Sequence, residues 1–178
     1  MNKPKIICII GKTCTGKDTL TRFLYTHFNI SHIVSYTTRP KRDSETNGKE
    51  HHFITEDEYK RVYANKDKLA YTEINGYKYF TTKDQVPVEG KVAYVIDPNG
   101  YKDLYNNYSN DFDFIVVYIK ADYETRKARY ESREQNISIP FEDRSSAEYV
   151  QFDTFEKDKR IHKDFVIDSS RLDFREDI

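Results

Sequence analysis

A glycine-rich segment near the N-terminus carries the clearest chemistry in the sequence. Gly11, Gly16 and Lys17 form a Gly-x4-Gly-Lys pattern directly after a run of apolar residues. Such glycines let the backbone curl until successive N–H groups point at a phosphate, and the helix that follows adds partial positive charge. The lysine can then bridge the β- and γ-phosphates. The segment predicts an ATP-type nucleotide site made of Gly11, Lys12, Thr13, Cys14, Thr15, Gly16, Lys17, Asp18 and Thr19.

The residue after the lysine departs from the usual pattern of such loops. A Ser or Thr commonly holds Mg²⁺ there, whereas this chain has Asp18 followed by Thr19. Because Mg²⁺ prefers oxygen ligands and keeps several waters, two arrangements are open. Either Asp18 binds the ion, directly or through water, or the ion is held mainly by phosphates and waters. Thr19 can still donate its hydroxyl to the α-phosphate, and Cys14 is interpreted as a small residue of the loop.

Two groups of arginines indicate what receives the phosphoryl group. Arg39 and Arg42 lie beside several hydroxyl side chains in a segment without helical or strand periodicity. Guanidinium groups bind phosphate oxygens in bidentate fashion, so this pair predicts a phosphomonoester site. A second group brackets residues 134–140 and can neutralise charge on a transferring phosphoryl group, which favours a kinase. Its members are Arg129 and Arg133, which share a helix face, Arg144, and Arg126, which is interpreted as a solvated charge.

The elements that would position these residues alternate between strands and helices. Apolar runs predict strands at residues 6–10, 33–35, 92–96, 114–119 and 165–167. Helical spacing and a capping box at Thr55 and Glu58 predict helices at residues 17–28, 55–64, 122–133 and 141–158. Asn75-Gly76 predicts a hairpin between strands 69–74 and 77–82, and loops or turns are expected at 37–50, 97–100 and 134–140. This order predicts an α/β domain with an inserted antiparallel hairpin.

Composition narrows the class of protein. With 178 residues the chain is expected to form one domain, and its 29 basic and 30 acidic residues give a net charge of −1. That charge gives no global attraction to nucleic acid or acidic membranes. The spacing of Cys8 and Cys14 fits neither a disulfide framework nor a zinc site, and the longest N-terminal apolar run is only Ile6 to Ile10. We therefore expect a cytoplasmic protein.

Several motifs together resemble the guanylate kinase family over nearly the whole chain. They are Ser35-x-Thr37-Thr38-Arg39-x-x-Arg42-x-x-Glu45-x-Asn47-Gly48, the Asn75-Gly76 hairpin with Tyr79 beyond it, the Asp97-x-x-Gly100 turn, and the spacing of Arg129, Arg133 and Arg144. The resemblance implies a P-loop NTPase core with three layers and a parallel sheet. It also implies one domain over residues 1–178, with a core (1–34, 91–125 and 160–178), an acceptor-binding region (about 35–90) and a helical lid (about 126–150).

The resemblance further implies an activity and roles for individual residues. The activity is transfer of the γ-phosphoryl group of Mg-ATP to GMP or dGMP, in purine metabolism, by a monomer or homodimer. The acceptor phosphate would be bound by Arg39, Arg42, Tyr79 and His51, and the base by Ser35, Thr81 and Asp97. The triphosphate and the transition state would be bound by Lys17, Arg129, Arg133 and Arg144. From the residues alone, Asp97 at the end of an apolar strand fits a metal ligand equally well.

Two departures from the family pattern keep other acceptors open. His51 replaces a tyrosine, and Ala70 replaces the glutamate that reads the guanine edge. Glu73 is three residues further on, so a regular strand would place it on the opposite face unless a bulge intervenes. One alternative is a ribose 1,5-bisphosphate kinase, which the Gly-Lys-Asp loop ending, Pro40, His52 and the absent carboxylate resemble. The other is a non-catalytic guanylate-kinase-like binding module, against which the intact phosphate loop argues.

Overall fold

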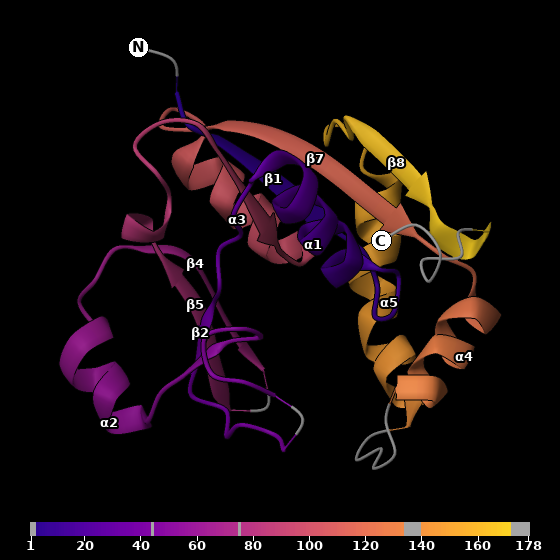
Figure 1. The fold of residues 1–178 in the computed structure, drawn as a ribbon, viewed down its shortest axis with the longest axis horizontal. Coiled ribbons are helices and arrows are strands. Elements are labelled where there is room, and N and C mark those ends of the chain that lie inside the picture. The colour runs from indigo at the N-terminus through magenta and orange to yellow at the C-terminus, as the bar shows by residue number, and fades with distance from the viewer. Residues whose placement is uncertain (1–2, 44, 75, 134–139, 172–178) are drawn as a thin grey trace.

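The fold places two separate sheets side by side. A computed structural model describes residues 3–43, 45–74, 76–133 and 140–171 (Figure 1). The first sheet is parallel, has the order β6-β1-β7-β8, and forms the centre of the molecule. The second has the order β3-β2-β5-β4 and extends to one side. The strands of the first sheet are β1 (Lys5–Ile10), β6 (Lys91–Val95), β7 (Asp113–Lys120) and β8 (Phe165–Asp168).

Helices cover both faces of the parallel sheet. Because neighbouring residues of β1 point to opposite faces, Ile6 and Cys8 contribute to one buried cluster, and Ile7 and Ile9 to the other. The first cluster includes residues of α3 (Pro98–Tyr108) and α5 (Phe141–Lys157), and Leu20 and Leu24 of α1 (Lys17–Phe28) pack against the second. This arrangement of three layers confirms the expected α/β class.

Helix α3 corrects the turn expected at residues 97–100. The side chain of Asp97 accepts hydrogen bonds from the backbone N–H groups of Asn99 and Gly100, both at 3.0 Å, and Pro98 stands at the first helical position. Asp at the N-cap followed by Pro is also a helix-start signal, because proline lacks the N–H that has no partner there. Tyr101 and Leu104 then point into the core, so tertiary packing selects the helix.

The second sheet contains short outer strands and one long hairpin. Its strands are β2 (Tyr36–Thr37), β3 (His52–Phe53), β4 (Lys68–Ile74) and β5 (Tyr77–Thr82), so the hairpin is confirmed, although Asn75 lies outside the described residues. The strand expected at residues 33–35 is wrong. The N–H of Ile33 donates to Ala93 at 2.8 Å beside β6, and regular pairing with the hairpin begins only at Tyr36.

The remaining helices lie at the two ends of the molecule. Of the expected capping box, the structure shows the N-cap hydrogen bond, in which the Thr55 hydroxyl accepts from the N–H of Glu58 at 3.1 Å. It opens α2 (Glu56–Glu58), which continues as a π-helical turn at Tyr59–Tyr63. At the opposite end α4 (Tyr123–Arg133) leads toward residues 134–139, where the expected loop lies outside the described part of the chain. In that described part no helix is both long and apolar enough to span a bilayer.

Candidate active site

The segment after β1 forms a tight loop at the N-terminus of α1. Gly16 has φ 96° and Cys14 has φ 62°, so the loop turns through left-handed conformations before the helix begins. Gly11 packs so closely against β7 that a Cβ atom there would lie 2.5 Å from the carbonyl oxygen of Ile119. Glycine is therefore required at position 11 by packing and favoured at position 16 by φ. The resulting loop lies at a helix N-terminus, a position at which proteins commonly bind anions.

Lys17 lies across this loop. Its Nζ donates hydrogen bonds to the carbonyl oxygens of Gly11 at 2.8 Å and Lys12 at 3.0 Å. Burial lowers the pKa of Lys17, while the charges of Asp18 and Glu148 act in the opposite direction. A triphosphate would add negative charge beside the ammonium group and favour its protonated form. The position of Lys17 fits the predicted contact with the β- and γ-phosphates.

Glu148 of α5 also contacts the phosphate loop, and sequence reasoning did not single it out. Its carboxylate accepts from the backbone N–H of Thr13 at 3.0 and 3.2 Å and from the Thr13 hydroxyl. Its Oε2 lies 3.8 Å from Nη1 of Arg126. Arg126 is only 4% exposed, which corrects its interpretation as a solvated charge. No local pattern could have found this contact, because the residues that form it belong to three different elements.

Glu148 is expected to stabilise the fold by compensating the charge of Arg126. In the described part of the chain, Nε and Nη1 of Arg126 are buried without a hydrogen-bond partner. Glu148→Ala should therefore lower the free energy of unfolding by about 2–3 kcal/mol, and adding Arg126→Met should recover much of that loss. Urea unfolding measures both effects. Glu131→Ala, on the exposed surface of α4, should change stability by less than about 0.5 kcal/mol. A double variant no more stable than Glu148→Ala would contradict the pairing.

The described arginines of the second group lie near the phosphate loop. Arg129 donates from Nη1 to the carbonyl oxygen of Cys14 at 3.3 Å and from Nη2 to that of Ser169 at 2.7 Å. The guanidinium group of Arg144 lies 5.9 Å from the centre of the Tyr130 ring, and its charge acts to lower the pKa of Lys17. The side chain of Arg133 lies outside the described residues. The structure thus brings Arg129 into contact with the loop and places the charge of Arg144 where it acts on Lys17, and it leaves Arg133 as a prediction.

Arg39 is held in a fixed orientation by Glu45. Its two terminal nitrogens donate to the two carboxylate oxygens at 3.0 and 2.7 Å, and the guanidinium group lies 5.4 Å from the centre of the Phe53 ring. Burial acts to raise the pKa of Glu45, but the hydrogen bonds from Arg39 and from the backbone N–H of Arg42 outweigh it and hold that pKa below its usual range. Arg39 is therefore preorganised, while Arg42 has an exposed side chain.

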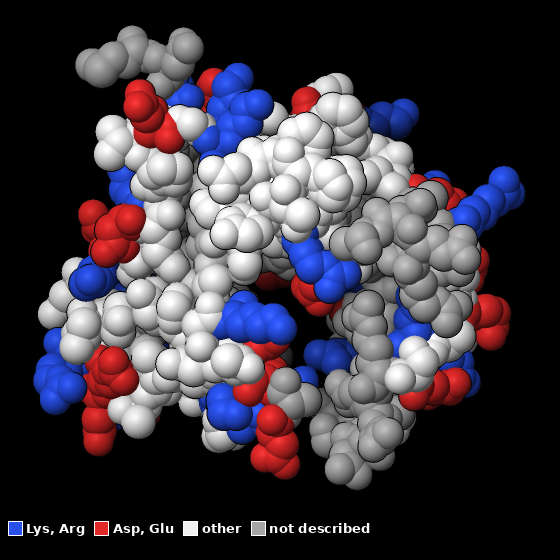
Figure 2. Space-filling model, in the orientation of Figure 1, with Lys and Arg blue, Asp and Glu red and all other residues white. Residues whose placement is uncertain are grey.

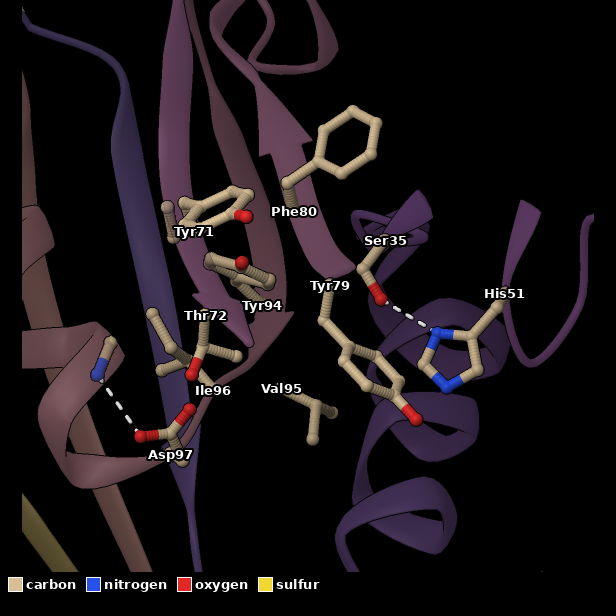
Figure 3. A pocket seen from close by; sticks show the side chains of 12 residues that line it. Ser35, His51, Tyr71, Thr72, Tyr79, Phe80, Tyr94, Val95, Ile96 and Asp97 are labelled. Atoms are coloured by element: carbon tan, nitrogen blue, oxygen red, sulfur yellow. Dashed lines mark hydrogen bonds between the residues drawn. The ribbon is translucent and has the colours of Figure 1, made fainter. Parts of the chain in front are cut away.

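A pocket of about 170 Å³ separates the second sheet from the end of β6 (Figure 3). Ser35, His51 and Tyr79 lie toward one end of the pocket, and Thr72, Ile96 and Asp97 toward the other. Its volume is below the ~300–1,000 Å³ of typical small-molecule sites, so it can enclose a ring while leaving attached groups outside. The full lining is Ser35, His51, Ala70, Tyr71, Thr72, Tyr79, Phe80, Tyr94, Val95, Ile96, Asp97 and Gly100.

Two residues predicted to contact the base occupy different positions in this site. Asp97 lines the pocket, and its Oδ1 accepts from α3 and from the side chain of Gln151. Thr81 lies outside the lining, and its hydroxyl is buried 3.0 Å from that of Tyr94. The described residues hold no group of three or more His, Cys, Asp or Glu side chains that could bind a metal. The role of Asp97 that the structure itself displays is helix capping.

The register of the hairpin decides which residue stands at the position that the family resemblance assigns to reading the guanine edge. A bulge between Lys68 and Ala70 precedes a regular pairing in which Ala70 lies opposite Thr81 and Thr72 opposite Tyr79. Directly paired residues point to the same face, so Ala70 and Thr72 face the pocket. Glu73 pairs with Lys78 and accepts from the Tyr71 hydroxyl at 3.3 Å on the other face. Glu73 therefore does not replace the missing carboxylate, and Thr72 is a pocket residue that the sequence did not single out.

His51 is expected to make stability sensitive to mild acid. Its Nδ1 lies 2.7 Å from Oγ of Ser35, and burial, with the charge of Arg39 in addition, lowers its pKa. The unfolded chain therefore binds the proton first, so stability falls as the pH drops below about 6.5. His51→Gln should reduce the loss between pH 7 and pH 5 by about 1 kcal/mol in urea unfolding. As a control, His27→Gln on the exposed surface should leave the loss of stability between pH 7 and pH 5 unchanged. If His51→Gln loses as much stability over this range as the unsubstituted protein, His51 is not the group responsible.

Comparisons with known proteins show which family the sequence resembles. The family model for guanylate kinase matches residues 3–174. A guanylate kinase from Symbiobacterium thermophilum is 33% identical over 123 residues, which cover 65% of this chain and 58% of that protein. One from Neisseria gonorrhoeae is 34% identical over 93 residues, 52% of this chain and 45% of that one. The chain thus spans about half the length of these curated relatives.

A comparison with solved structures also finds a guanylate kinase. The crystal structure of guanylate kinase from Anaplasma phagocytophilum aligns with a TM-score of 0.63 over 99% of this chain and 81% of that one. At 19% identity the likeness shows a shared fold.

Proposed function

Since the chain belongs to the guanylate kinase family, we propose that it transfers the terminal phosphoryl group of ATP to a nucleoside monophosphate, with GMP and dGMP as the favoured acceptors. The observation that carries this proposal is that a single turn of α5 contacts both candidate sites. Glu148 binds Thr13 in the phosphate loop, and Gln151, three residues further along, donates to Asp97 at the acceptor pocket. Residues three apart on a helix lie about 5–6 Å apart, so the two sites are neighbours.

The topology explains why these sites meet. Strands β1 and β6 are parallel neighbours, with Ile9 opposite Val95, so the phosphate loop and Asp97 both follow the carboxyl ends of strands at one edge of the sheet. Open α/β sheets bind ligands at this edge. Figure 2 shows an opening beside the lobe that contains the second sheet, with basic and acidic side chains at its edge. In the proposal the acceptor region is residues 35–90 and the lid is residues 126–150.

The proposed reaction is a direct, in-line transfer between two phosphates. The acceptor phosphate is already ionised at neutral pH, so no side chain has to remove a proton from it, and catalysis depends on positioning and charge. Arg39, fixed by Glu45, would orient the acceptor phosphate together with Arg42, Tyr79 and His51. Lys17 and the lid arginines Arg129, Arg133 and Arg144 would neutralise charge on the transferring group.

Magnesium fits the residues of this site as a partner of ATP. When bound, Mg²⁺ would neutralise negative charge on the phosphates of ATP. Asp18 stands exposed on the first turn of α1, and the described part of the chain has no larger group of acidic or histidine ligands. A single carboxylate suits an ion that keeps most of its waters and binds substrate phosphates. We propose that Asp18 holds the ion, directly or through water.

ADP release from Mg-ATP tests the proposed function. The acceptors to be compared are GMP, dGMP, AMP, CMP, UMP and ribose 1,5-bisphosphate. The last of these tests the alternative kinase, which is favoured by the methyl group of Ala70 in the pocket. We expect turnover with GMP and dGMP. Turnover with ribose 1,5-bisphosphate only would establish the alternative, and no turnover with any acceptor would refute a kinase and support a binding module.

The cellular setting is part of the same proposal. We propose a monomer or homodimer that acts in the cytoplasm, in purine metabolism, on ATP and a small phosphorylated acceptor and without nucleic acid or membrane as a partner. The net charge of −1 supports the absence of a polyanionic partner.

A further inference from the structure

At one end of the acceptor pocket, two polar groups of the described chain have free hydrogen-bonding capacity. Most of its other side-chain donors and acceptors are occupied: the Ser35 hydroxyl pairs with His51, and the Tyr94 hydroxyl with Thr81. Oδ1 of Asp97 accepts from α3 and from Gln151. In the described part of the chain, neither Oδ2 of Asp97 nor the hydroxyl of Thr72 has a hydrogen-bond partner. These two groups are available to a ligand.

The two free groups lie together at the end of the pocket opposite to His51 and Tyr79, the two lining residues beside Arg39. Thr72 projects from β4 and Asp97 follows β6, and in Figure 3 the Thr72 hydroxyl points toward the Asp97 carboxylate. Ile96 lies at the same end, and Ala70 and Val95 add apolar surface to the rest of the pocket. A planar ring whose edge carries two hydrogen-bonding atoms would fit there, with its attached phosphate directed toward the Arg39 side.

The chemistry of the two groups determines which ring edges they can bind. An ionised carboxylate only accepts hydrogen bonds, whereas a hydroxyl both donates and accepts. Asp97 can therefore accept from the exocyclic amine of either purine. Thr72 can donate to ring nitrogen N1 of adenine, which is an acceptor, or accept from N1–H of guanine, which is a donor. The amine is on C6 of adenine and on C2 of guanine, so with the ring turned accordingly the hydroxyl can pair with N1 of either purine and rejects neither.

We propose that Thr72 is a specificity-determining residue and that it makes this pocket accept both purine nucleoside monophosphates, AMP as well as GMP. The inference rests on the proposed kinase function and names the substrate class of the same site. A buried hydrogen-bonding group excludes an analogue by 10⁴-fold or more only when that analogue leaves the group unpaired, which neither purine does to a hydroxyl. AMP and GMP should therefore differ in kcat/KM by less than about 10-fold.

Two substitutions at Thr72 separate its proposed role from a structural one. Thr72→Val keeps the shape and removes the hydroxyl, so kcat/KM for AMP and for GMP should both fall by about 10-fold. Thr72→Asp leaves an acceptor only, so the ratio of GMP to AMP should rise by about 10-fold or more. Glu73→Gln, on the opposite face of β4, is the matched control and should leave the ratio unchanged.

Binding of GMP and AMP by calorimetry gives a readout that does not depend on phosphoryl transfer. In the unsubstituted protein the two dissociation constants should agree within about 10-fold, and Thr72→Asp should weaken AMP selectively. A preference of more than about 100-fold for either purine in the unsubstituted protein, or an unchanged ratio in Thr72→Asp, would overturn the inference. Turnover with GMP alone would leave the proposed kinase intact while refuting the inference, whereas purine binding without turnover would refute the kinase.

Discussion

Replacing Lys17 with methionine should lower kcat for phosphoryl transfer by about 10³-fold while the protein stays folded. Methionine keeps the aliphatic part of the side chain and removes the ammonium group, which in this structure lies across the phosphate loop on the carbonyl oxygens of Gly11 and Lys12. Charge that develops on the transferring group would then lose the stabilising Lys17 cation. Steady-state assays with Mg-ATP and GMP measure the loss.

A matched control separates this effect from a general loss of positive charge. Lys102→Met removes an exposed ammonium group from α3 and should leave kcat within about 2-fold, since surface substitutions away from a site have small effects. Near-normal turnover in the Lys17 variant would remove the phosphate loop from the mechanism. A large fall in its unfolding temperature would instead point to a structural role for Lys17.

Replacing Arg39 with alanine should raise the KM of the acceptor by about 10²-fold and leave the KM of ATP unchanged. The guanidinium group is preorganised by two hydrogen bonds to Glu45 and by the Phe53 ring, so little freedom is lost when it binds a phosphate. Arg39→Lys should recover only part of the loss, because an ammonium group cannot bind both Glu45 and a phosphate in bidentate fashion. Acceptor and ATP titrations measure the two constants separately.

The control for Arg39 is another arginine of the same region. Arg61 is exposed on the π-helical turn after α2, and Arg61→Ala should change neither KM by more than about 2-fold. An unchanged acceptor KM in Arg39→Ala, or a rise confined to ATP, would show that this arginine lies outside the acceptor site. Partial unfolding of the variant would show as a loss of cooperativity in urea.

The sequence predicted those elements whose signals are local. Helix α1 has the predicted bounds, Lys17–Phe28, because it follows a loop that ends in Gly16 and shows clear apolar spacing. The hairpin strands differ from prediction by one residue, because Asn75-Gly76 is a strong turn signal. Helix α3 was missed because Asp97-Pro98 can begin either a turn or a helix, and only the packing of Tyr101 and Leu104 selects the helix.

In the candidate site, too, some features follow from the sequence and others from the tertiary structure. The sequence by itself determined the phosphate loop, because its glycines, lysine, strand and helix are contiguous and need no other part of the chain to define them. Only the tertiary structure decided that Glu148 binds Thr13 and that Gln151 binds Asp97, since these pairs are 135 and 54 residues apart. It also placed Thr72 in the pocket and Glu73 outside it, because a bulge and the pairing with β5 fix which face of β4 each residue occupies. Local chemistry can be read from neighbouring residues, whereas contacts between distant segments depend on strand order and register.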